Sequence, residues 1–382
     1  MDFSPFKRLG RPLPGVDSAA KGLRKYKGLF DSLSFEEKII DVIELEHSNN
    51  FEEVPHVVGI DGGRQFRDHL SISLVLARAA AVSGKEGLVE TRSALNILPV
   101  SSNVDNYAGL LMGHLELSIA RHFIRQTPHV LNKEGKKQDF KHLKPDIILL
   151  DGSFESIFQQ GLPKSFLYYL STGEWSEKIR ENSFAGKYLR LFKAYSITLS
   201  KLIEDAVKND VLLLAVSKDS KARFLAENFN LNVDIPDTVI AMFLLNKTPS
   251  YLHPLIRTPK IDAHIANFWK KQGLFKCFPN DPTPIITMKS TFMKYSNYSE
   301  PFRLDYLSFQ EDKFNELLPK LSLIMDTSGF PFFARWSHQF AHVTNDEIET
   351  IDTLFINHAL KMQLSNEIIG KLLPLTRRRR IQ

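Results

Sequence analysis

The stretch that decides the fold is VVGIDGGR, residues Val57–Arg64. Its β-branched start is typical of a strand, and the carboxylate Asp61 stands where the next two glycines predict a turn. Leu70–Leu74 alternates apolar and polar residues with period two, and Gly87–Pro99 supplies a further strand. We therefore expect an antiparallel three-strand meander from residue 57 to about 98.

Downstream of the meander, helices alternate with short apolar strands. The expected elements are a helix at Asp105–Arg125, a strand at Asp146–Asp151, a helix at Ser183–Val207, a strand at Val211–Val216 and a helix at Asp219–Asn228. Such alternation is typical of crossover connections between parallel strands. The sequence thus predicts an α/β fold, in which a mixed sheet is flanked by helices.

The segments outside this core have a different character. Ser34–Glu37 has the form of a helix capping box and predicts an N-terminal helix over Phe35 to about Glu46. Residues 247–301 are rich in proline, aromatic residues and lysine, so an irregular insertion is expected there. A terminal helix is expected at Asn345–Leu364, and the cationic tail Arg377–Arg380 either reaches phosphates or is a solvated end. The expected organisation is a helical extension at 1–50, one elaborated domain at 51–345, and a C-terminal helix with a basic tail at 346–382.

Composition excludes several classes of protein. The chain has 382 residues, 43% hydrophobic and 24% charged, which is typical of a globular protein. Its longest nearly uncharged run, Leu70–Val82, is 13 residues, and a membrane span needs about 20. The first residues lack a continuous apolar secretory segment, so we expect a cytoplasmic protein. A single cysteine, Cys277, excludes an intramolecular disulfide and a cysteine-rich metal site, and the net charge of +5 permits a polyanionic partner without requiring one.

Two carboxylates follow strands that can be neighbours. Asp61 comes after the first predicted strand, and Asp151 ends the strand that follows the long helix. If these strands pair side by side and parallel, both side chains emerge at the same edge of the sheet. The alternative is that each Asp merely begins a turn, which the glycine after it favours.

A third acid, Glu116, lies on the apolar face of the predicted helix at Asp105–Arg125. At about 100° per residue, it points in nearly the same direction as Met112 and Phe123. A carboxylate in that position needs a cation, a proton or strong hydrogen-bond donors, because its desolvation is costly. The cation is either a shared metal or a basic side chain such as Lys218 or Arg303.

Three carboxylates suit Mg²⁺ or Mn²⁺, which prefer oxygen ligands and leave positions open for water and phosphate. A pair of such ions hydrolyses phosphodiesters by in-line displacement. Lys218 follows the strand at Val211–Val216 and could hold a phosphate or offset the acidic charge. Its neighbour Asp219 could complete the ligand set or merely cap the next helix.

The order of these parts resembles the ribonuclease-H-like fold, and the local motifs resemble the NurA family of DNA-repair nucleases. The motifs run in order over about 57–343: VGIDGGR at Val58–Arg64, ILLDGS at Ile148–Ser153, SKDS at Ser217–Ser220, GFP at Gly329–Pro331 and SH at Ser337–His338.

The resemblance implies specific roles and partners. Asp61, Glu116 and Asp151 match the metal-binding acids of the family, and His338 matches its active-site histidine. The family acts on DNA ends with manganese, forms a dimer and works with the hexameric translocase HerA. Two departures are visible: Gly63 stands where serine is usual, which should alter only a turn, and Phe330 stands where tyrosine is common.

Candidate DNA contacts are weaker signals. Arg64 belongs to the first motif, and Arg303 is a candidate phosphate contact. The run Phe268–Lys271, with Lys270 and Lys271, could stack on bases and bind phosphates, or it could be a buried aromatic patch with solvated lysines. His338 and His342 are spaced for one helical face, but no adjacent glutamate completes a zinc motif, so His342 is expected to be structural.

These observations favour a Mn²⁺- or Mg²⁺-dependent deoxyribonuclease, an exonuclease with endonuclease activity left open, that processes broken DNA ends with a HerA-type translocase. Asp61, Glu116 and Asp151 would bind the metals, and Lys218 and His338 would position phosphate or water. The alternative is a catalytically weak DNA-binding or translocase-regulating subunit, which the missing tyrosine hydroxyl at Phe330 favours. A nuclease of the same fold acting on RNA is a third, weaker reading, because the fold does not select the sugar.

Overall fold

The computed structural model describes residues 42–44, 54–85, 87–125, 144–160, 162–172, 183–218, 222–228, 235–245, 249–275 and 286–362. All of them belong to one compact unit, Val42–Gln382. None of the helices in these ranges is long and apolar enough to cross a membrane.

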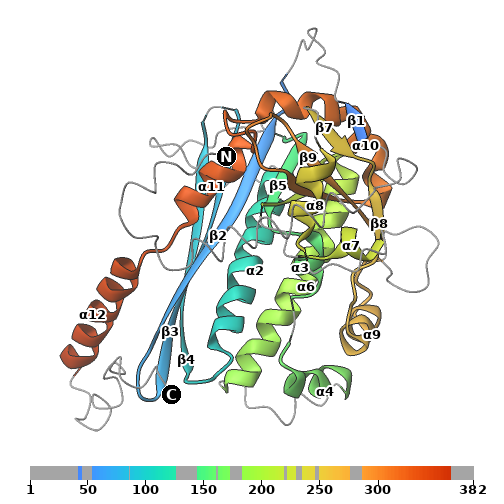
Figure 1. The fold of residues 1–382 in the computed structure, drawn as a ribbon. Coiled ribbons are helices and arrows are strands. Elements are labelled where there is room, and N and C mark those ends of the chain that lie inside the picture. The colour runs from blue at the N-terminus through green and yellow to red at the C-terminus, as the bar shows by residue number, and fades with distance from the viewer. Residues whose placement is uncertain are drawn as a thin grey trace, which may run out of the picture. The chain divides into compact units, whose positions relative to one another are not determined.

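A ten-stranded sheet forms the centre of the described part of the chain (Figure 1). Its order is β1-β7-β9-β10-β6-β5-β2-β3-β4, and β8 pairs with β9. The strands are β1 (Val42–Glu44), β2 (Val57–Asp68), β3 (Ile72–Ser83), β4 (Val89–Pro99), β5 (Ile147–Asp151), β6 (Leu212–Ser217), β7 (Ser250–Leu252), β8 (Leu255–Arg257), β9 (Met288–Lys294) and β10 (Phe302–Leu307). β5 pairs in parallel with both β2 and β6, and the other pairs are antiparallel, so the predicted mixed sheet is confirmed.

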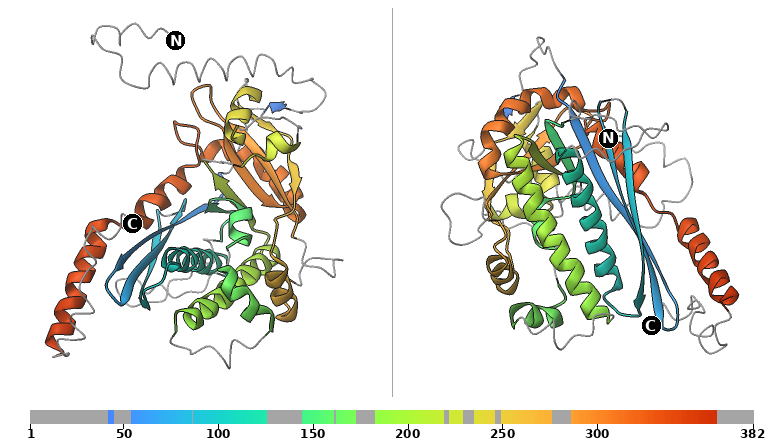
Figure 2. Two further views of the ribbon diagram at one scale, coloured as in Figure 1. Left: turned by 60° about the horizontal axis from the view of Figure 1, so that its bottom comes forward. Right: turned by 180° about the vertical axis from the view of Figure 1, so that it is seen from behind.

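Helices cover both faces of the sheet (Figure 2). One face is covered by α2 (Val104–Arg125), α3 (Phe154–Phe158), α4 (Lys164–Thr172), α6 (Phe184–Lys208) and α9 (Ala263–Lys271). The other carries α10 (Glu311–Leu317), η4 (Leu318–Ile324) and α11 (Phe332–Ala341), and α12 (Asn345–Lys361) packs farther along β2 and β3. The short helices η3 (Ser308–Gln310), α7 (Phe224–Asn228) and α8 (Asp237–Leu244) also belong to the described part of the chain.

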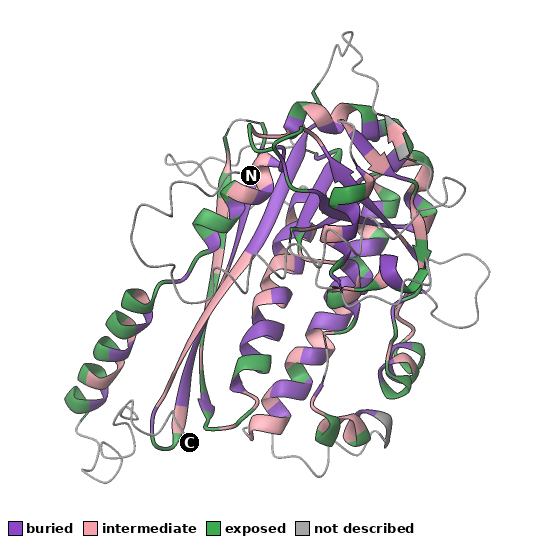
Figure 3. Cartoon of the chain, in the orientation of Figure 1, coloured by how far each residue is buried: buried purple, intermediate pink, exposed green. Residues whose placement is uncertain are grey.

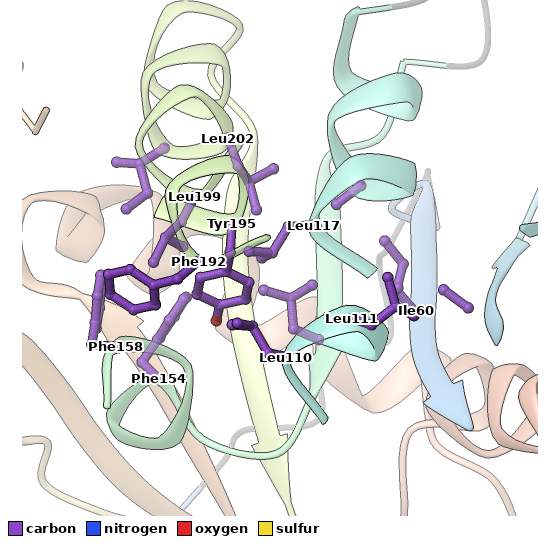
Figure 4. Packing of buried hydrophobic residues seen from close by; sticks show 14 of the residues in the cluster. Ile60, Leu110, Leu111, Leu117, Phe154, Phe158, Phe192, Tyr195, Leu199 and Leu202 are labelled. Atoms are coloured by element: carbon purple, nitrogen blue, oxygen red, sulfur yellow. The ribbon is translucent and has the colours of Figure 1, made fainter. Parts of the chain in front are cut away.

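The central strands are apolar on both faces because both faces are covered. Along β5, Ile148 and Leu150 enter the core beneath α2 and α6, whereas Ile147 and Leu149 enter the core beneath α10 and α11. Figure 4 shows how Phe154, Phe158 and the residues of α6 fill the first of these cores, and Figure 3 shows that burial is concentrated in the middle strands. This double burial explains the continuous apolar runs that predicted parallel strands.

The three-strand meander and the helix at 105–125 are confirmed, but β2 is longer than predicted. It runs unbroken through Asp68, and its pairing with β3 continues across Gly62 and Gly63. The predicted turn after Asp61 is therefore wrong. A pair of glycines predicts a turn only where no other contact fixes the backbone. Here β3 pairs with β2 along nearly its whole length and keeps the backbone extended.

The N-terminal helix predicted over Phe35 to about Glu46 is wrong at residues 42–44, the part of it that the structure describes. Val42–Glu44 is the strand β1, paired antiparallel with β7, and not the end of a helix. The remainder of the predicted helix, 35–41 and 45–46, lies outside the described residues, as does the tail Arg377–Arg380. β-branched residues such as Val42 and Ile43 suit either structure, and a distant partner strand decides between them.

The insertion expected at 247–301 is also more regular than predicted, since β7, β8, α9 and β9 lie within it. The described prolines fall between these elements: Pro254 separates β7 from β8, and Pro259 follows β8. Proline interrupts a strand but is compatible with its ends, so the prolines here mark boundaries of short strands. The helix predicted at 219–228 is shorter in the structure. It is α7, Phe224–Asn228, and residues 219–221 lie outside the described residues.

Candidate active site

The register of the parallel strands places two acids side by side. The last parallel pair between β2 and β5 joins Ile60 to Leu150, so the next residues, Asp61 and Asp151, are neighbours where β5 ends. Asp151 also pairs with Val216 of β6. The expectation that these strands lie parallel and adjacent is confirmed.

Asp61 is a buried carboxylate with defined donors. It is 3% exposed, its Oδ2 lies 2.6 Å from Nδ1 of His338, and its Oδ1 accepts a 2.6 Å hydrogen bond from the backbone N–H of Gly62. Burial raises the pKa of Asp61, although His338 and Lys218 act in the opposite direction. The structure thus joins the histidine near the end of the chain to the first acid.

α11 can lie directly on β2 because glycines face it. A Cβ on Gly59 would stand 2.3 Å from the carbonyl oxygen of Phe333, and one on Gly63 would stand 2.1 Å from that of Ala341. The sequence predicted that the change from serine to Gly63 would affect only a turn, but Gly63 lies inside β2 and not in a turn. It leaves room for the helix that carries His338, and the serine usual in the family would require that helix to shift.

Glu116 reaches the same strand from the opposite face of the sheet. A Cβ on Gly62 would lie 2.1 Å from Glu116 Oε1, so this carboxyl packs against the backbone beside Asp61. Burial raises the pKa of Glu116 to about 8, with further increases from the charges of Asp61 and Asp151 and an opposing effect from Arg64. Among the described residues it makes no hydrogen bond or ion pair, so the predicted alternative of a salt bridge to Lys218 or Arg303 is not found.

Asp151 lies at the open end of β5, where its side chain remains exposed. The pKa of its carboxyl is nevertheless raised to about 6, first by desolvation and then by Asp61, against the opposing charges of His338 and Lys218. The backbone N–H of the following Gly152 donates to the carbonyl of Val216, which fixes the end of β5 against β6.

The three acids form an electrostatic cluster that is not a ready-made metal site. Asp61 faces α11, Glu116 approaches from α2, and Asp151 is the exposed last residue of β5, beside Asp61. No group of three or more Asp, Glu, His or Cys side chains within the described ranges is already arranged to hold an ion. The donor set still fits a hard divalent cation, because Asp61 raises the cost of ionising both Glu116 and Asp151, Asp151 adds to that cost at Glu116, and a cation would reverse it.

Lys218 lies beside this cluster, as predicted, while Asp219 lies outside the described residues. Its Nζ sits 3.9 Å from the centroid of the Phe330 ring. Phe330 is 6% exposed and packs edge-on against Phe302, with ring centroids 5.5 Å apart. The aromatic ring that replaces the family's tyrosine therefore contacts the candidate phosphate-binding lysine.

The prediction that Arg303 contacts phosphate is wrong. Its side chain is 3% exposed, and Nη2 is 2.9 Å from Oδ2 of Asp305. The same carboxylate accepts hydrogen bonds from the backbone N–H of Phe154 and the hydroxyl of Ser290. Asp305, which the sequence analysis missed, thus anchors the start of α3 just after Asp151; the i, i+2 spacing of Arg303 and Asp305 in an apolar strand was the available signal.

The other candidate DNA contacts separate into two groups. Arg64 lies three residues beyond Asp61, pairs with Asp105 at 3.2 Å, and lines a hollow of about 460 Å³ between α2 and α3. Lys270 and Lys271 are exposed on α9, which packs against α4 and not beside the acids.

The aromatic residues of α9 are core residues and not base-stacking platforms. Phe268 and Trp269 are 4% and 1% exposed, and the Trp269 indole donates to the hydroxyl of Ser196. The alternative of a buried aromatic patch with solvated lysines is therefore the one observed. His342 is exposed, and it contributes through its backbone: its N–H donates to the carbonyl of His338 at 3.0 Å at the end of α11, and its carbonyl accepts from Arg78 at 3.2 Å.

Comparison with protein families adds a decisive finding. The model of the NurA domain matches residues 55–343. The chain belongs to the NurA family. The match contains all the motifs on which the resemblance was based, from the VGIDGGR segment to His338.

Solved NurA structures share the fold. The NurA nuclease from Sulfolobus solfataricus has a TM-score of 0.61 at 19% identity, covering 94% of this chain and 98% of that one. A NurA structure with manganese gives 0.56 at 13% identity, covering 94% and 100%, and one bound to dAMP and manganese gives 0.54 at 12% identity, covering 97% and 99%. A comparison with curated protein sequences found no match.

Proposed function

We propose that this NurA protein is a metal-dependent DNA nuclease whose active site is the cluster of Asp61, Glu116 and Asp151. The observation that carries the proposal is the convergence of these acids where β5 ends, with carboxyl pKa values raised to about 8 at Glu116 and about 6 at Asp151. Membership of a nuclease family and the manganese in two related structures support it.

The acids would hold Mn²⁺, or Mg²⁺, through their oxygens. Such an ion supplies positive charge to the leaving oxygen and makes bound water more acidic. Asp61 would at the same time orient His338, because its Oδ2 already engages Nδ1 and leaves Nε2 directed away from the pair. A histidine held in this way can accept or return a proton at Nε2.

Lys218 would bind the phosphate that is being cleaved. Its ammonium lies close enough to Asp61 and Asp151 to lower the pKa of both carboxyls, so a phosphate held by the acidic cluster and its metal would also meet this cation. Arg64, on the other side of β2, would contact the adjacent part of the strand from the hollow between α2 and α3. Lys270 and Lys271 could contact more distant DNA.

We further propose, from the family resemblance, that the protein processes DNA double-strand break ends in the cytoplasm as a homodimer, together with a HerA-type hexameric translocase. Exonuclease action is the primary expectation. The buried site with one open end at Asp151 favours a chain end as substrate over a continuous duplex.

Digestion of end-labelled DNA tests the proposal. The wild-type chain should release nucleotides with Mn²⁺ but not with EDTA, and Asp151→Asn should abolish release because it removes one negative oxygen from the ligand set. Asp312→Asn on the exposed start of α10 is the matched control and should cleave normally. Cleavage by Asp151→Asn at the wild-type rate would reject the site, and DNA binding without cleavage by the folded wild-type chain would favour the alternative of a translocase-regulating subunit.

A further inference from the structure

Lys218 holds an unusual position for a surface lysine. It follows β6, whose residue Val216 pairs with Asp151, so its backbone leaves the sheet beside the acids. Yet in the described part of the chain the ammonium forms no ion pair or hydrogen bond with Asp61, Asp151 or any other group. Instead the ammonium lies over the face of the Phe330 ring, with Nζ 3.9 Å from the ring centroid.

The ring itself is firmly placed. Phe302 of β10 packs against it at 73° between planes, and it belongs to the core beneath α10 and α11. The turn before it is closed by two backbone hydrogen bonds between Asp326 and Phe330 or Gly329, and Gly329 has the positive φ of +73° that the turn requires. Arg335 of α11 secures the same turn through a 2.8 Å ion pair with Asp326.

We propose that Phe330 is a positioning residue that holds the Lys218 ammonium beside Asp61 and Asp151 through a cation–π contact. The inference rests on the proposed nuclease function, in which Lys218 binds the phosphate. An aromatic face attracts a cation without neutralising it and leaves its N–H groups available to oxygen atoms. A carboxylate partner would instead occupy those donors and oppose an incoming phosphate.

This contact also gives a physical reason for phenylalanine at a position where the family commonly has tyrosine. The interaction uses the ring face, which both residues share, so it does not need the hydroxyl. It also reduces the freedom of a long side chain that would otherwise sample many rotamers in solvent. The missing hydroxyl therefore leaves the lysine positioned and the site competent.

The test combines substitution at Phe330 with substitution at Lys218. In single-turnover cleavage of labelled DNA with Mn²⁺, Phe330→Leu should slow the reaction about threefold to thirtyfold, the range that a cation–π contact spans, and Phe330→Tyr should stay within about twofold. In a Lys218→Met background, Phe330→Leu should have no further effect. Phe340→Leu, an exposed ring on α11, is the matched control and should cleave normally.

A second measurement does not depend on cleavage. Lysines are ¹³C-methylated, which keeps their charge, and the Lys218 signal is assigned by its loss in Lys218→Arg. The ring current of Phe330 should shift this signal upfield in the wild type and in Phe330→Tyr, and Phe330→Leu should return it to the bulk of the lysine signals. Thermal melting of each variant verifies that the chain is folded.

Three results would overturn the proposal: a Lys218 signal that Phe330→Leu leaves in place, an equal loss of rate in Phe330→Tyr and Phe330→Leu, or an undiminished effect of Phe330→Leu in the Lys218→Met background. The last result would assign Phe330 to packing alone. If the wild-type chain released no nucleotides, the nuclease function would fail, while the NMR signal would still decide whether the ring holds the lysine.

Discussion

Replacing Glu116 by glutamine should make the metal-free protein more stable at alkaline pH. The carboxyl packs against Gly62 and has no hydrogen-bond or ion-pair partner among the described residues. Burial and the neighbouring charges of Asp61 and Asp151 raise its pKa from 4.5 to about 8. Ionised Glu116 is therefore a destabilising group that only a bound cation would offset.

The raised pKa sets both the size and the pH range of the effect. The stability contributed by the neutral carboxyl is fully present below about pH 4.5 and is lost as the pH rises through about 8, because the unfolded chain loses the proton first. At about 1.4 kcal/mol for each tenfold change in proton affinity, the loss reaches at most about 5 kcal/mol, and the side chain's partial exposure reduces it to about 2–4 kcal/mol. Glutamine cannot ionise, so it does not lose this contribution.

Urea unfolding followed by circular dichroism in EDTA should show this difference. Between about pH 5 and 8.5 the wild type should lose stability relative to Glu116→Gln, until the variant is more stable by about 2–4 kcal/mol. At pH 7.5, Mn²⁺ should stabilise the wild type more than the variant, because it binds the folded carboxylate cluster.

The control is Glu227→Gln, on the exposed side of α7, which should follow the wild-type profile at every pH. Parallel profiles for Glu116→Gln and the wild type, or a variant that is less stable at pH 8.5, would refute the assignment of Glu116 as a half-buried carboxyl with no hydrogen-bond or ion-pair partner among the described residues.

Further substitutions test the surroundings of the site. Gly62→Ala should sharply reduce Mn²⁺-dependent cleavage, since its Cβ would lie 2.1 Å from the Glu116 carboxyl, and normal cleavage would show that this carboxyl does not pack there. Asp305→Ala should destabilise the chain by about 3–5 kcal/mol in urea unfolding, because it breaks the buried ion pair with Arg303 and removes the acceptor of the Phe154 N–H and the Ser290 hydroxyl, and a loss below about 1 kcal/mol would contradict these contacts. Thr344→Ala should cost about 1 kcal/mol by removing the N-cap of α12, measured by thermal melting, and an unchanged melting temperature would show that α12 does not depend on this cap.

The sequence predicted the site where local patterns suffice. Asp61 and Asp151 each follow a β-branched run, and the pairing of Ile60 with Leu150 brings them together as the rule for parallel strand ends requires. The position of Glu116 followed from helical periodicity, since one helix face must point to the sheet. These inferences rely on a strand or helix period and need no knowledge of distant contacts.

The features that the sequence did not predict depend on contacts between distant segments. β1 exists because Val42 pairs with Leu252, and the continuation of β2 past Asp61 depends on the whole length of β3. Arg303 looked like a phosphate contact because its burial depends on β6 and β9, the distant strands that flank β10, although its partner Asp305 stands only two residues away. The ring of Phe330 meets Lys218 only after β6 and β10 have paired, so neither sequence motif reveals their contact.

The central claim is that Asp61, Glu116 and Asp151 together hold a divalent cation, and anomalous diffraction from crystals grown with Mn²⁺ tests it most directly. We expect a manganese peak at the end of β5, at about 2.1 Å from oxygens of these carboxylates. The peak should disappear in Asp61→Asn crystals grown in the same way. Manganese bound only elsewhere, or wild-type crystals with no peak between these carboxylates, would contradict this expectation.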